Sequence, residues 1–387
     1  MKDLVALFHR EDPTRPVTQG NDQIVAEPLP AFDEYLDALD IVGYNYVNRW
    51  RERAELLFTP DKILHPEWKM IGTENGGIRG MRGSFSLGND SKEVNPNYTT
   101  GMVGALPLWR YTATHDFVIG DFMWTGIDYL GEARWPSRGA GSGQIDMAGF
   151  PKSSYYFYQS FWTNKPTVHV FPHWNWEGRE GQVIPVLAFT NCDEVELFVN
   201  GKSFGVQRIY FPRYGMAGRY GGRDRPAVQA TTNDLHAYWT VPYAPGEIKV
   251  VGKQQGKVVA TDIVQTFGKP AALRVAVDKN TIRANGDDIA HITVEIVDSN
   301  GRLVQTAQNA ITMVVKGEAQ LLGMESGDNR SMNSGNFRNL ASGQPATKEA
   351  YYGLILGYVQ AAKKAGSVTV EVSSPGLKSA QVTFSTR

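Results

Sequence analysis

The sequence predicts a multidomain protein in which an α/β unit is followed by two all-β units of the immunoglobulin-like sandwich type. The first 165 or so residues alternate between helical and strand signals, and the strands are continuous apolar runs, as in a parallel sheet covered by helices. After about Lys165 helical periodicity disappears, and short alternating strands separated by turn signals take over. A break at 267–270 (FGKP) divides this second part. We therefore expect domains at residues 1–165, 166–268 and 269–387.

The elements of the α/β unit follow from its apolar periodicity. Residues 2–10 place their apolar side chains on one helical face, and Asp12-Pro13 ends that helix. A second helix is expected around residues 30–39. Polar or glycine residues follow the predicted strands, and chemistry at the carboxyl ends of strands is the signature of a (β/α) barrel. The expected strands are a short run at 16–18 and buried strands at 40–47, 68–73 and 117–124.

The two sandwiches are predicted from short strands bounded by turns such as Asn200-Gly201-Lys202 and Ser299-Asn300-Gly301. In the first sandwich we expect strands at 183–190, 195–199, 235–241 and 248–253, and in the second at 273–277, 290–298, 368–372 and 380–384.

Two polar segments are predicted as loops. Residues 75–115 are rich in glycine, serine and asparagine, and a loop of that length inside a compact domain is usually functional or disordered. We expect an active-site loop there. Residues 328–349 are expected to form a surface loop.

The composition excludes several classes of function. A net charge of −1, with 20% charged residues, gives no electrostatic basis for binding nucleic acid or an anionic membrane surface. No run of about 18 apolar residues occurs, so no membrane span is expected. The single cysteine, Cys192, excludes an internal disulfide and a thiolate metal cluster. The apolar run at residues 4–8 is too short for a signal peptide, so the compartment cannot be inferred from the sequence.

Glu74 is the candidate catalytic residue, because it lies where the predicted strand 68–73 ends. Retaining glycosidases hold two carboxyl groups about 5–5.5 Å apart, one as nucleophile and one as proton donor. Glu74 suits the nucleophile role, and a solvated surface carboxylate is the competing interpretation. Tyr44 and Asn45 end the preceding strand, where a phenol can hydrogen-bond the carboxylate and keep it ionised. Trp124 ends the following strand, where an indole can floor a sugar subsite, although Tyr44 and Trp124 could also be packing residues.

Three long motifs resemble strands six, seven and eight of the barrel in family 2 glycoside hydrolases of the β-galactosidase kind. They are residues 40–46 (DIVGYNY), 71–76 (IGTENG) and 120–132 (GDFMWTGIDYLGE). Residues 135–138 (WPSR) and 146–152 (DMAGFPK) resemble the loop that follows strand eight, and 173–176 and 190–198 resemble the first appended sandwich. The resemblance covers essentially the whole chain.

The resemblance implies an activity and a set of site residues. Glu74 would be the nucleophile supported by Tyr44, and Asn45, Trp124 and Asp128 would bind the sugar. The substrate would be a terminal β-galactoside of an oligo- or polysaccharide. No cofactor and no metal are expected.

The resemblance also implies that the chain holds only part of the fold. In this family the acid/base glutamate follows an asparagine at the end of strand four, and residues 2–10 resemble the helix just after that strand. The fold would then be a partial (β/α)8 TIM barrel, strands five to eight, followed by the two sandwiches. Without its proton donor the chain alone is expected to be weakly active or inactive. Asp128, Glu132 and Asp146 are the candidate substitutes.

Two other readings of the chain are open. One is a non-catalytic carbohydrate-binding or scaffold protein with a relic half-barrel. The other is a split glycosidase, in which a partner chain carries the missing barrel half. Bacterial members of the family often act outside the cytoplasm, so a periplasmic or extracellular location is an expectation of the resemblance alone.

Two histidine segments also have alternative interpretations. His115 is either a ligand or sugar contact or, as we favour, a histidine at a helix end or in the core. His173, with Trp174 and Trp176, either forms a sugar-binding face or packs as a domain interface against the barrel, and we favour the interface.

Overall fold

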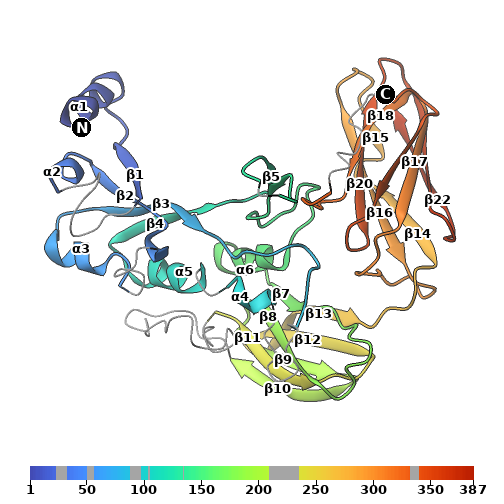
Figure 1. The fold of residues 1–387 in the computed structure, drawn as a ribbon, viewed down its shortest axis with the longest axis horizontal. Coiled ribbons are helices and arrows are strands. Elements are labelled where there is room, and N and C mark those ends of the chain that lie inside the picture. Colours follow the sequence, from blue (N-terminus) through green and yellow to red (C-terminus); the bar gives the residue numbers. More distant parts are fainter. Residues whose placement is uncertain are drawn as a thin grey trace.

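The computed structural model describes residues 1–22, 33–49, 56–87, 97–102, 105–133, 135–208, 235–331 and 340–387. In the view of Figure 1 the chain forms a U. An α/β unit is one arm, a β-sandwich built from residues 168–265 is the base, and a second sandwich built from residues 272–386 is the other arm. Within the described part of the chain, no helix is both long enough and apolar enough to cross a membrane.

The α/β unit is built on a four-stranded parallel sheet with the strand order β1-β2-β3-β4. The predicted strands at 40–47, 68–73 and 117–124 and the helix at 2–10 are confirmed. The core of this unit is apolar and includes Val42, Met70, Leu108 and Val118. The strands are β1 (Thr18–Asp22), β2 (Ile41–Asn45), β3 (Met70–Gly76) and β4 (Val118–Trp124). The helices are α1 (Lys2–Glu11), α2 (Asp33–Leu36), η1 (Val47–Arg49), α3 (Thr59–Leu64), α4 (Asn97–Thr100), α5 (Ala105–Thr114) and α6 (Ser153–Trp162).

Two segments predicted as loops contain regular structure. The segment 75–115 ends in helix α5, which buries Leu106, Leu108 and Tyr111 because its apolar residues recur at helical spacing, and the short helix α4 precedes it. Residues 88–96 and 103–104 of that segment lie outside the described residues. The segment 328–349 contains strand β19 (Pro345–Glu349), which pairs with β17 (Ala310–Gly317) and carries the buried Lys348. Residues 332–339 lie outside the described residues.

The first sandwich packs the sheet β10-β9-β12-β13 on the sheet β11-β8-β7. Its core consists of the inward-facing residues of both sheets together with Trp174 and Trp176. The strands are β7 (Val168–Phe171), β8 (Val183–Thr190), β9 (Glu194–Val199), β10 (Lys202–Arg208), β11 (Ala237–Pro242), β12 (Glu247–Gln254) and β13 (Lys257–Gln265).

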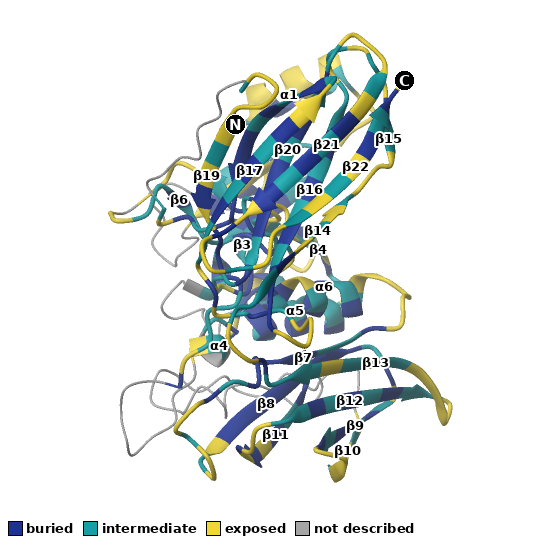
Figure 2. Cartoon of the chain, turned by 90° about the vertical axis from the view of Figure 1, so that its right-hand side faces the viewer, coloured by how far each residue is buried: buried dark blue, intermediate teal, exposed yellow. Residues whose placement is uncertain are grey.

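The second sandwich packs the sheet β14-β16-β20-β18 on the sheet β15-β22-β21-β17-β19. Buried and less buried residues alternate along its central strands, as a strand with one face on the core requires (Figure 2). The remaining strands are β14 (Ala272–Val277), β15 (Thr281–Ile282), β16 (Ile289–Val297), β18 (Ala319–Glu325), β20 (Leu354–Ala361), β21 (Gly366–Ser373) and β22 (Ala380–Thr386). A two-stranded ribbon, β5 (Tyr129–Leu130) and β6 (Gly139–Ala140), follows β4.

Arg82, in the segment after β3, ties the α/β unit to the second sandwich. Its side chain is 7% exposed, and its Nε donates to Asp146 Oδ2 at 2.5 Å. Its Nη2 donates to the carbonyl oxygens of Ser326 and Tyr351, each at 2.8 Å. The rings of Phe150 and Tyr351 lie 5.0 and 5.5 Å from the guanidinium carbon. One buried cation therefore fixes three separate segments of the chain.

We predict that Arg82→Met lowers the free energy of unfolding by about 3–5 kcal/mol, because Asp146 would keep a buried charge without its partner. Urea denaturation followed by tryptophan fluorescence measures this change. Arg274→Met is the matched control, because Arg274 pairs with Glu295 on the surface with its side chain 53% exposed. A surface pair contributes at most about 1 kcal/mol. Equal losses in the two variants would contradict the role assigned to Arg82.

Candidate active site

Polar side chains gather at the carboxyl edge of the parallel sheet. Because all four strands run in the same direction, their carboxyl ends meet at one edge. In the register, Asn45 of β2 lies opposite Glu74 of β3, and Trp124 of β4 lies opposite Gly76. The structure therefore brings the sequence-predicted residues Asn45, Glu74 and Trp124 to the same edge.

Strand β3 is bulged where it carries Glu74. Tyr44 and Asn45 are consecutive in β2, yet they pair with Gly72 and Glu74, so β3 holds one extra residue, Thr73, at this point. The register with β4 also shifts between Gly72 and Asn75. A bulge of this kind bends the strand and redirects the next side chain. The bulge thus contributes to the direction in which Glu74 projects.

The phenol that donates to Glu74 belongs to Tyr46, two residues after the one predicted. Tyr46 Oη donates to Glu74 Oε1, and the Tyr46 backbone N–H donates to the Glu74 carbonyl oxygen at 2.7 Å. Tyr46 has a φ of 52°, which turns the chain at the end of β2. Tyr44 is instead a fully buried core residue, and its Oη donates to Asp61 Oδ2 at 2.9 Å. The prediction missed this because it placed Tyr44 at the strand end, whereas β2 continues to Asn45 before it turns.

Asn45 lies between Glu74 and strand β1. Its Oδ1 accepts a hydrogen bond from Thr73 Oγ1 at 2.9 Å, and its side chain lies over Gly20. The side chain of the bulged residue Thr73 is therefore bonded to the neighbouring strand. Asn45 holds the backbone next to Glu74 in place.

Asn75 and Asp121 form a second polar link next to Glu74. Asn75 Nδ2 donates to Asp121 Oδ1 at 2.6 Å, and Asn75 Oδ1 accepts from the backbone N–H of Val47 at 3.3 Å. The pair passes over Gly72, where a Cβ atom would overlap both side chains. Burial raises the pKa of Asp121 to about 6, although the hydrogen bond from Asn75 opposes this rise. Sequence reasoning missed Asp121, although a lone carboxylate inside the apolar strand VIGDFMW was a usable signal.

Trp124 lies partly exposed at the edge of the candidate site, where a ligand can contact it. Its side chain is 37% exposed, and its Nε1 donates to Tyr129 Oη at 3.0 Å. The two rings meet edge to face with centroids 5.7 Å apart, so the indole is held in one orientation. Tyr129 Oη in turn donates to Glu132, which has a φ of 47° and is exposed.

Asp128 lies in the protein interior, so its predicted contact with substrate is corrected. It is 4% exposed, and its Oδ1 accepts from Lys152 Nζ and from the Gly143 backbone N–H, each at 2.8 Å. Burial raises the pKa of Asp128, and the Lys152 ammonium opposes this rise. Asp146 is also buried, where it accepts from Arg82. Both carboxylates form ion pairs with buried basic side chains, so they are poorly placed to replace a proton donor.

The described residues contain one group of possible metal ligands. Asp37, His65 and Glu67 bring ligand atoms within 4.8 Å of one another, away from Glu74 at the opposite end of β3. Asp37 Oδ1 already accepts from Trp68 Nε1 at 2.8 Å. His115 stacks on Tyr111 at 3.8 Å just after α5, so the prediction of a helix-end histidine is confirmed.

Two family models match the C-terminal part of the chain. Residues 273–383 match glycoside hydrolase family 2 C-terminal domain 5, and residues 181–260 match a domain of unknown function, DUF4982.

Curated relatives are similar over most of the chain. A β-galactosidase of Bacteroides ovatus is 33% identical over 99% of this chain, and a putative β-glucuronidase of Formosa agariphila is 33% identical over 67% of it. The chain spans 43% of the length of the first relative and 24% of the second.

Solved structures show the same arrangement of elements. A β-glycosidase from Bacteroides vulgatus superposes with a TM-score of 0.77 at 28% identity, covering 99% of this chain and 48% of that one. A family 2 glycosyl hydrolase from Bacteroides cellulosilyticus superposes with a TM-score of 0.73 at 26% identity, covering 100% of this chain and 46% of that one.

The raised pKa of Asp121 predicts a pH dependence of stability. A carboxyl whose pKa is about 6 in the folded protein, against an ordinary 3.8, contributes stability that is present below pH 3.8 and lost as the pH rises through 6. Asp121→Asn keeps an acceptor for Asn75 but cannot ionise. We therefore expect this variant to gain stability relative to the parent between pH 4 and pH 7.

Urea midpoints measured at half-unit pH intervals test this expectation. Asp116→Asn, a substitution of an exposed residue just before β4, controls for the loss of one negative charge. If the two variants differed from the parent protein by the same amount at every pH, the assignment to Asp121 would be contradicted.

Proposed function

The chain belongs to glycoside hydrolase family 2, and we propose that Glu74 is the nucleophile of a retaining β-glycosidase. The hydrogen bond from Tyr46 Oη to Glu74, made at a bulged strand end, is the observation that carries this assignment. In a retaining mechanism the carboxylate attacks the anomeric carbon, the leaving oxygen departs with a proton from a second carboxyl, and water then releases the sugar. A phenol that donates to the carboxylate fixes the direction in which the carboxylate points.

We propose that the α/β unit is the second half of a (β/α)8 barrel, strands five to eight. Its four parallel strands leave β1 and β4 as the outer strands of the sheet, and β4 exposes Ile119 and Phe122 at 55% and 64%. Large apolar side chains on an outer strand suit further strands packed beside it. Residues 166–268 and 269–387 are proposed as the two sandwich domains, since the matched family models fall within them.

The general acid is proposed to come from the barrel half that the chain does not supply. The B. ovatus relative is more than twice as long as its matched part. Loss of general-acid assistance typically costs about 10²- to 10⁴-fold in rate. The chain alone is therefore proposed to be weakly active or inactive, and a partner chain that carries the missing half would restore hydrolysis.

A neutral β-galactoside is the proposed substrate. A glucuronide would require a cation for its carboxylate, and the two described basic side chains between β4 and α6 are already paired. Lys152 bonds Asp128 at 2.8 Å, and Arg138 bonds Glu325 at 2.7 Å. The name of the B. ovatus relative, which is similar over 99% of the chain, supports the same sugar class. Asn45 and Trp124 are the proposed sugar contacts.

Mechanism-based labelling tests the nucleophile. In a polypeptide that completes the barrel, a 2-deoxy-2-fluoro β-galactoside should label Glu74, and peptide mass spectrometry identifies the modified residue. The chain alone should hydrolyse p-nitrophenyl β-galactoside at least about 10²-fold more slowly than the completed protein. A label on another residue would refute the role of Glu74. A faster turnover of the β-glucuronide would refute the proposed sugar while leaving the nucleophile in place.

A matched pair of tyrosine variants tests the support of the nucleophile. Tyr46→Phe in the completed protein removes a hydrogen bond to a charged group, so kcat/KM should fall by about 10- to 100-fold. Tyr44→Phe is the control, because its hydroxyl donates to Asp61 in the core. We expect it to lower thermal stability with little change in kcat/KM. A larger kinetic loss in Tyr44→Phe would reverse the assignment.

A further inference from the structure

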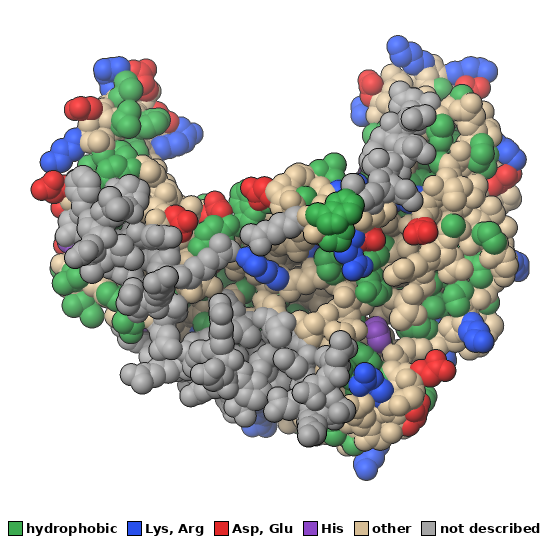
Figure 3. Space-filling model, in the orientation of Figure 1, with side chains coloured by type: hydrophobic (Ala, Val, Ile, Leu, Met, Phe, Trp, Pro, Cys, Tyr) green, Lys and Arg blue, Asp and Glu red, His purple; other side chains and the backbone are tan. Residues whose placement is uncertain are grey.

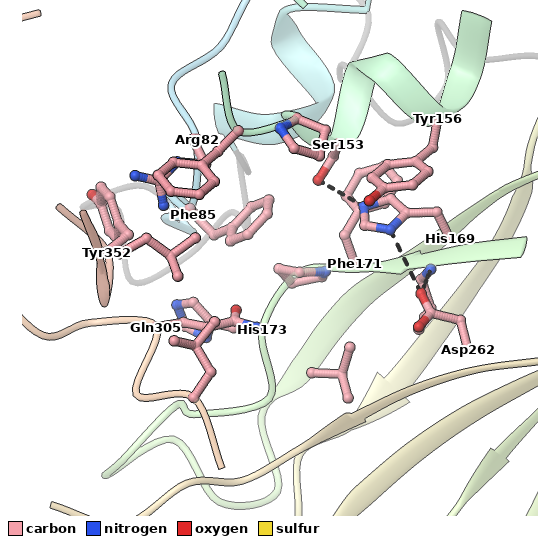
Figure 4. Close-up of a pocket in the computed structure, with 18 of the residues that line it drawn as sticks. Arg82, Phe85, Ser153, Tyr156, His169, Phe171, His173, Asp262, Gln305 and Tyr352 are labelled. Carbon is pink, nitrogen blue, oxygen red and sulfur yellow. Dashed lines mark hydrogen bonds and ion pairs between the residues drawn. The ribbon is translucent and has the colours of Figure 1, made fainter. Parts of the chain in front are cut away.

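A partly open cavity lies where the α/β unit and both sandwiches meet (Figure 4). Its volume of about 360 Å³ falls within the range of small-molecule sites. Arg82 and Phe85 reach it from the segment after β3, His173 from the segment after β7, and Gln305 and Tyr352 from the second sandwich. None of the residues at the Glu74 edge lines this cavity, so it is distinct from the proposed catalytic site.

His173, a largely buried residue, presents a donor to the cavity. Its side chain is 6% exposed, and its Nδ1 accepts from the backbone N–H of Asn175 at 3.3 Å. Burial lowers the pKa of His173 to about 4, so the ring is neutral at physiological pH. A neutral ring whose Nδ1 accepts carries its proton on Nε2. Nε2 makes no hydrogen bond to another described residue and is not fully buried, so a ligand or water in the cavity can meet this N–H.

Gln305 adds an unpaired amide to the same cavity. Its side chain is partly buried and makes no hydrogen bond within the described part of the chain. An amide offers two donors and a carbonyl acceptor. Together with His173, it supplies the donors and the acceptor that adjacent hydroxyl groups of one ligand would require.

Aromatic rings also line the cavity. Phe85 meets the His173 ring edge to face, with centroids 5.6 Å apart. Tyr352 lies against the backbone of Gly83, where a Cβ atom would come within 2.6 Å of Tyr352 Cγ. The absence of a side chain at Gly83 therefore allows the Tyr352 ring to approach the backbone closely beside the cavity. Aromatic faces suit the apolar C–H faces of a sugar ring as well as other flat apolar groups.

The charged groups of the wall are already paired. Arg82 bonds Asp146 and two carbonyl oxygens. Asp262 accepts from the backbone N–H groups of Val170 and Ile263 at 2.8 and 2.9 Å. Among the described lining residues, every positively charged side chain is therefore already paired, and none remains to bind an anionic ligand.

Ser153, His169 and Asp262 resemble a nucleophile–base–acid series but are better explained as structure. His169 Nε2 lies 3.0 Å from Ser153 Oγ, and its Nδ1 lies 3.6 Å from Asp262 Oδ2 (Figure 4). Burial lowers the pKa of His169, which weakens it as a base. The ring also stacks on Tyr156 with centroids 4.0 Å apart. Ser153, His169 and Asp262 therefore form a rigid part of the cavity wall.

We propose that the junction cavity binds a neutral pyranose, either a free monosaccharide or one unit of a glycan. The cavity volume admits one such ring, the aromatic walls match its C–H faces, and His173 and Gln305 match its hydroxyl groups. Because the wall offers no free charge, a uronic acid binds less well there. This site does not depend on Glu74.

Isothermal titration of the 387-residue chain with methyl β-D-galactopyranoside and methyl β-D-glucopyranoside tests the site. At least one of the two should bind saturably and retain its affinity in Glu74→Gln. Gln305→Ala should weaken binding about 3- to 10-fold, the effect of losing one neutral hydrogen bond. Gln308→Ala, an exposed residue of the same segment, is the matched control and should leave the affinity unchanged. His173→Phe, which keeps an aromatic ring but lacks the N–H, should weaken binding to a similar extent.

Several results would overturn the site. These are the absence of saturable binding by either neutral glycoside, equal affinity in Gln305→Ala and Gln308→Ala, or loss of binding in Glu74→Gln. Tighter binding of methyl β-D-glucuronide than of both neutral sugars would also overturn it. Thermal melting of each variant separates loss of binding from loss of folding. Because the titration needs no turnover, its outcome is independent of whether Glu74 is the nucleophile.

Discussion

The buried guanidinium of Arg82 is the constraint on which the arrangement of domains depends. A charge removed from water must find a partner of opposite charge and satisfy its remaining donors, or folding becomes costly. Arg82 meets this requirement with Asp146 and with carbonyl oxygens of the second sandwich. The segment that follows β3 is therefore held against two segments of the second sandwich, at Ser326 and Tyr351. In Figure 3 the molecule is hollowed between the two arms of the U.

At the carboxyl edge of the sheet, hydrogen bonds between neighbouring strands fix the residues around Glu74. The extra residue in β3 redirects Glu74, Asn45 bonds the bulged Thr73, and Tyr46 bonds Glu74 by both its hydroxyl and its backbone N–H. Asn75 links the same strand to Asp121. Thr73 and Asn75, on either side of the proposed nucleophile, are thus each fixed by a hydrogen bond that they donate to an adjacent strand, and such preorganisation favours catalysis.

The sequence predicted the parts of the fold that local patterns determine. Apolar runs located β2, β3 and β4, and the change of periodicity near Lys165 located the sandwiches. It could not distinguish Tyr44 from Tyr46, because the choice depends on one backbone turn at a φ of 52°. It assigned Asp128 to sugar binding because its buried partner, Lys152, lies 24 residues away in the chain and no local pattern reveals it. Helix α5 was missed because the glycine-rich residues before it dominated the composition of the segment.

The segment that contains His173, Trp174 and Trp176 shows why packing and binding are not exclusive alternatives. Trp174 is fully buried and donates to the Ala244 carbonyl oxygen at 2.9 Å, and Trp176 belongs to the same core. These indoles are packing residues and therefore fix the backbone of the segment. The neighbouring His173 projects from that fixed backbone into a cavity that is also lined by residues of the α/β unit and of the second sandwich. A rigid core on one side and an unpaired donor on the other is the arrangement that a ligand site needs. Since Arg82 also lines the cavity, the interaction that joins the domains helps to give the cavity its shape.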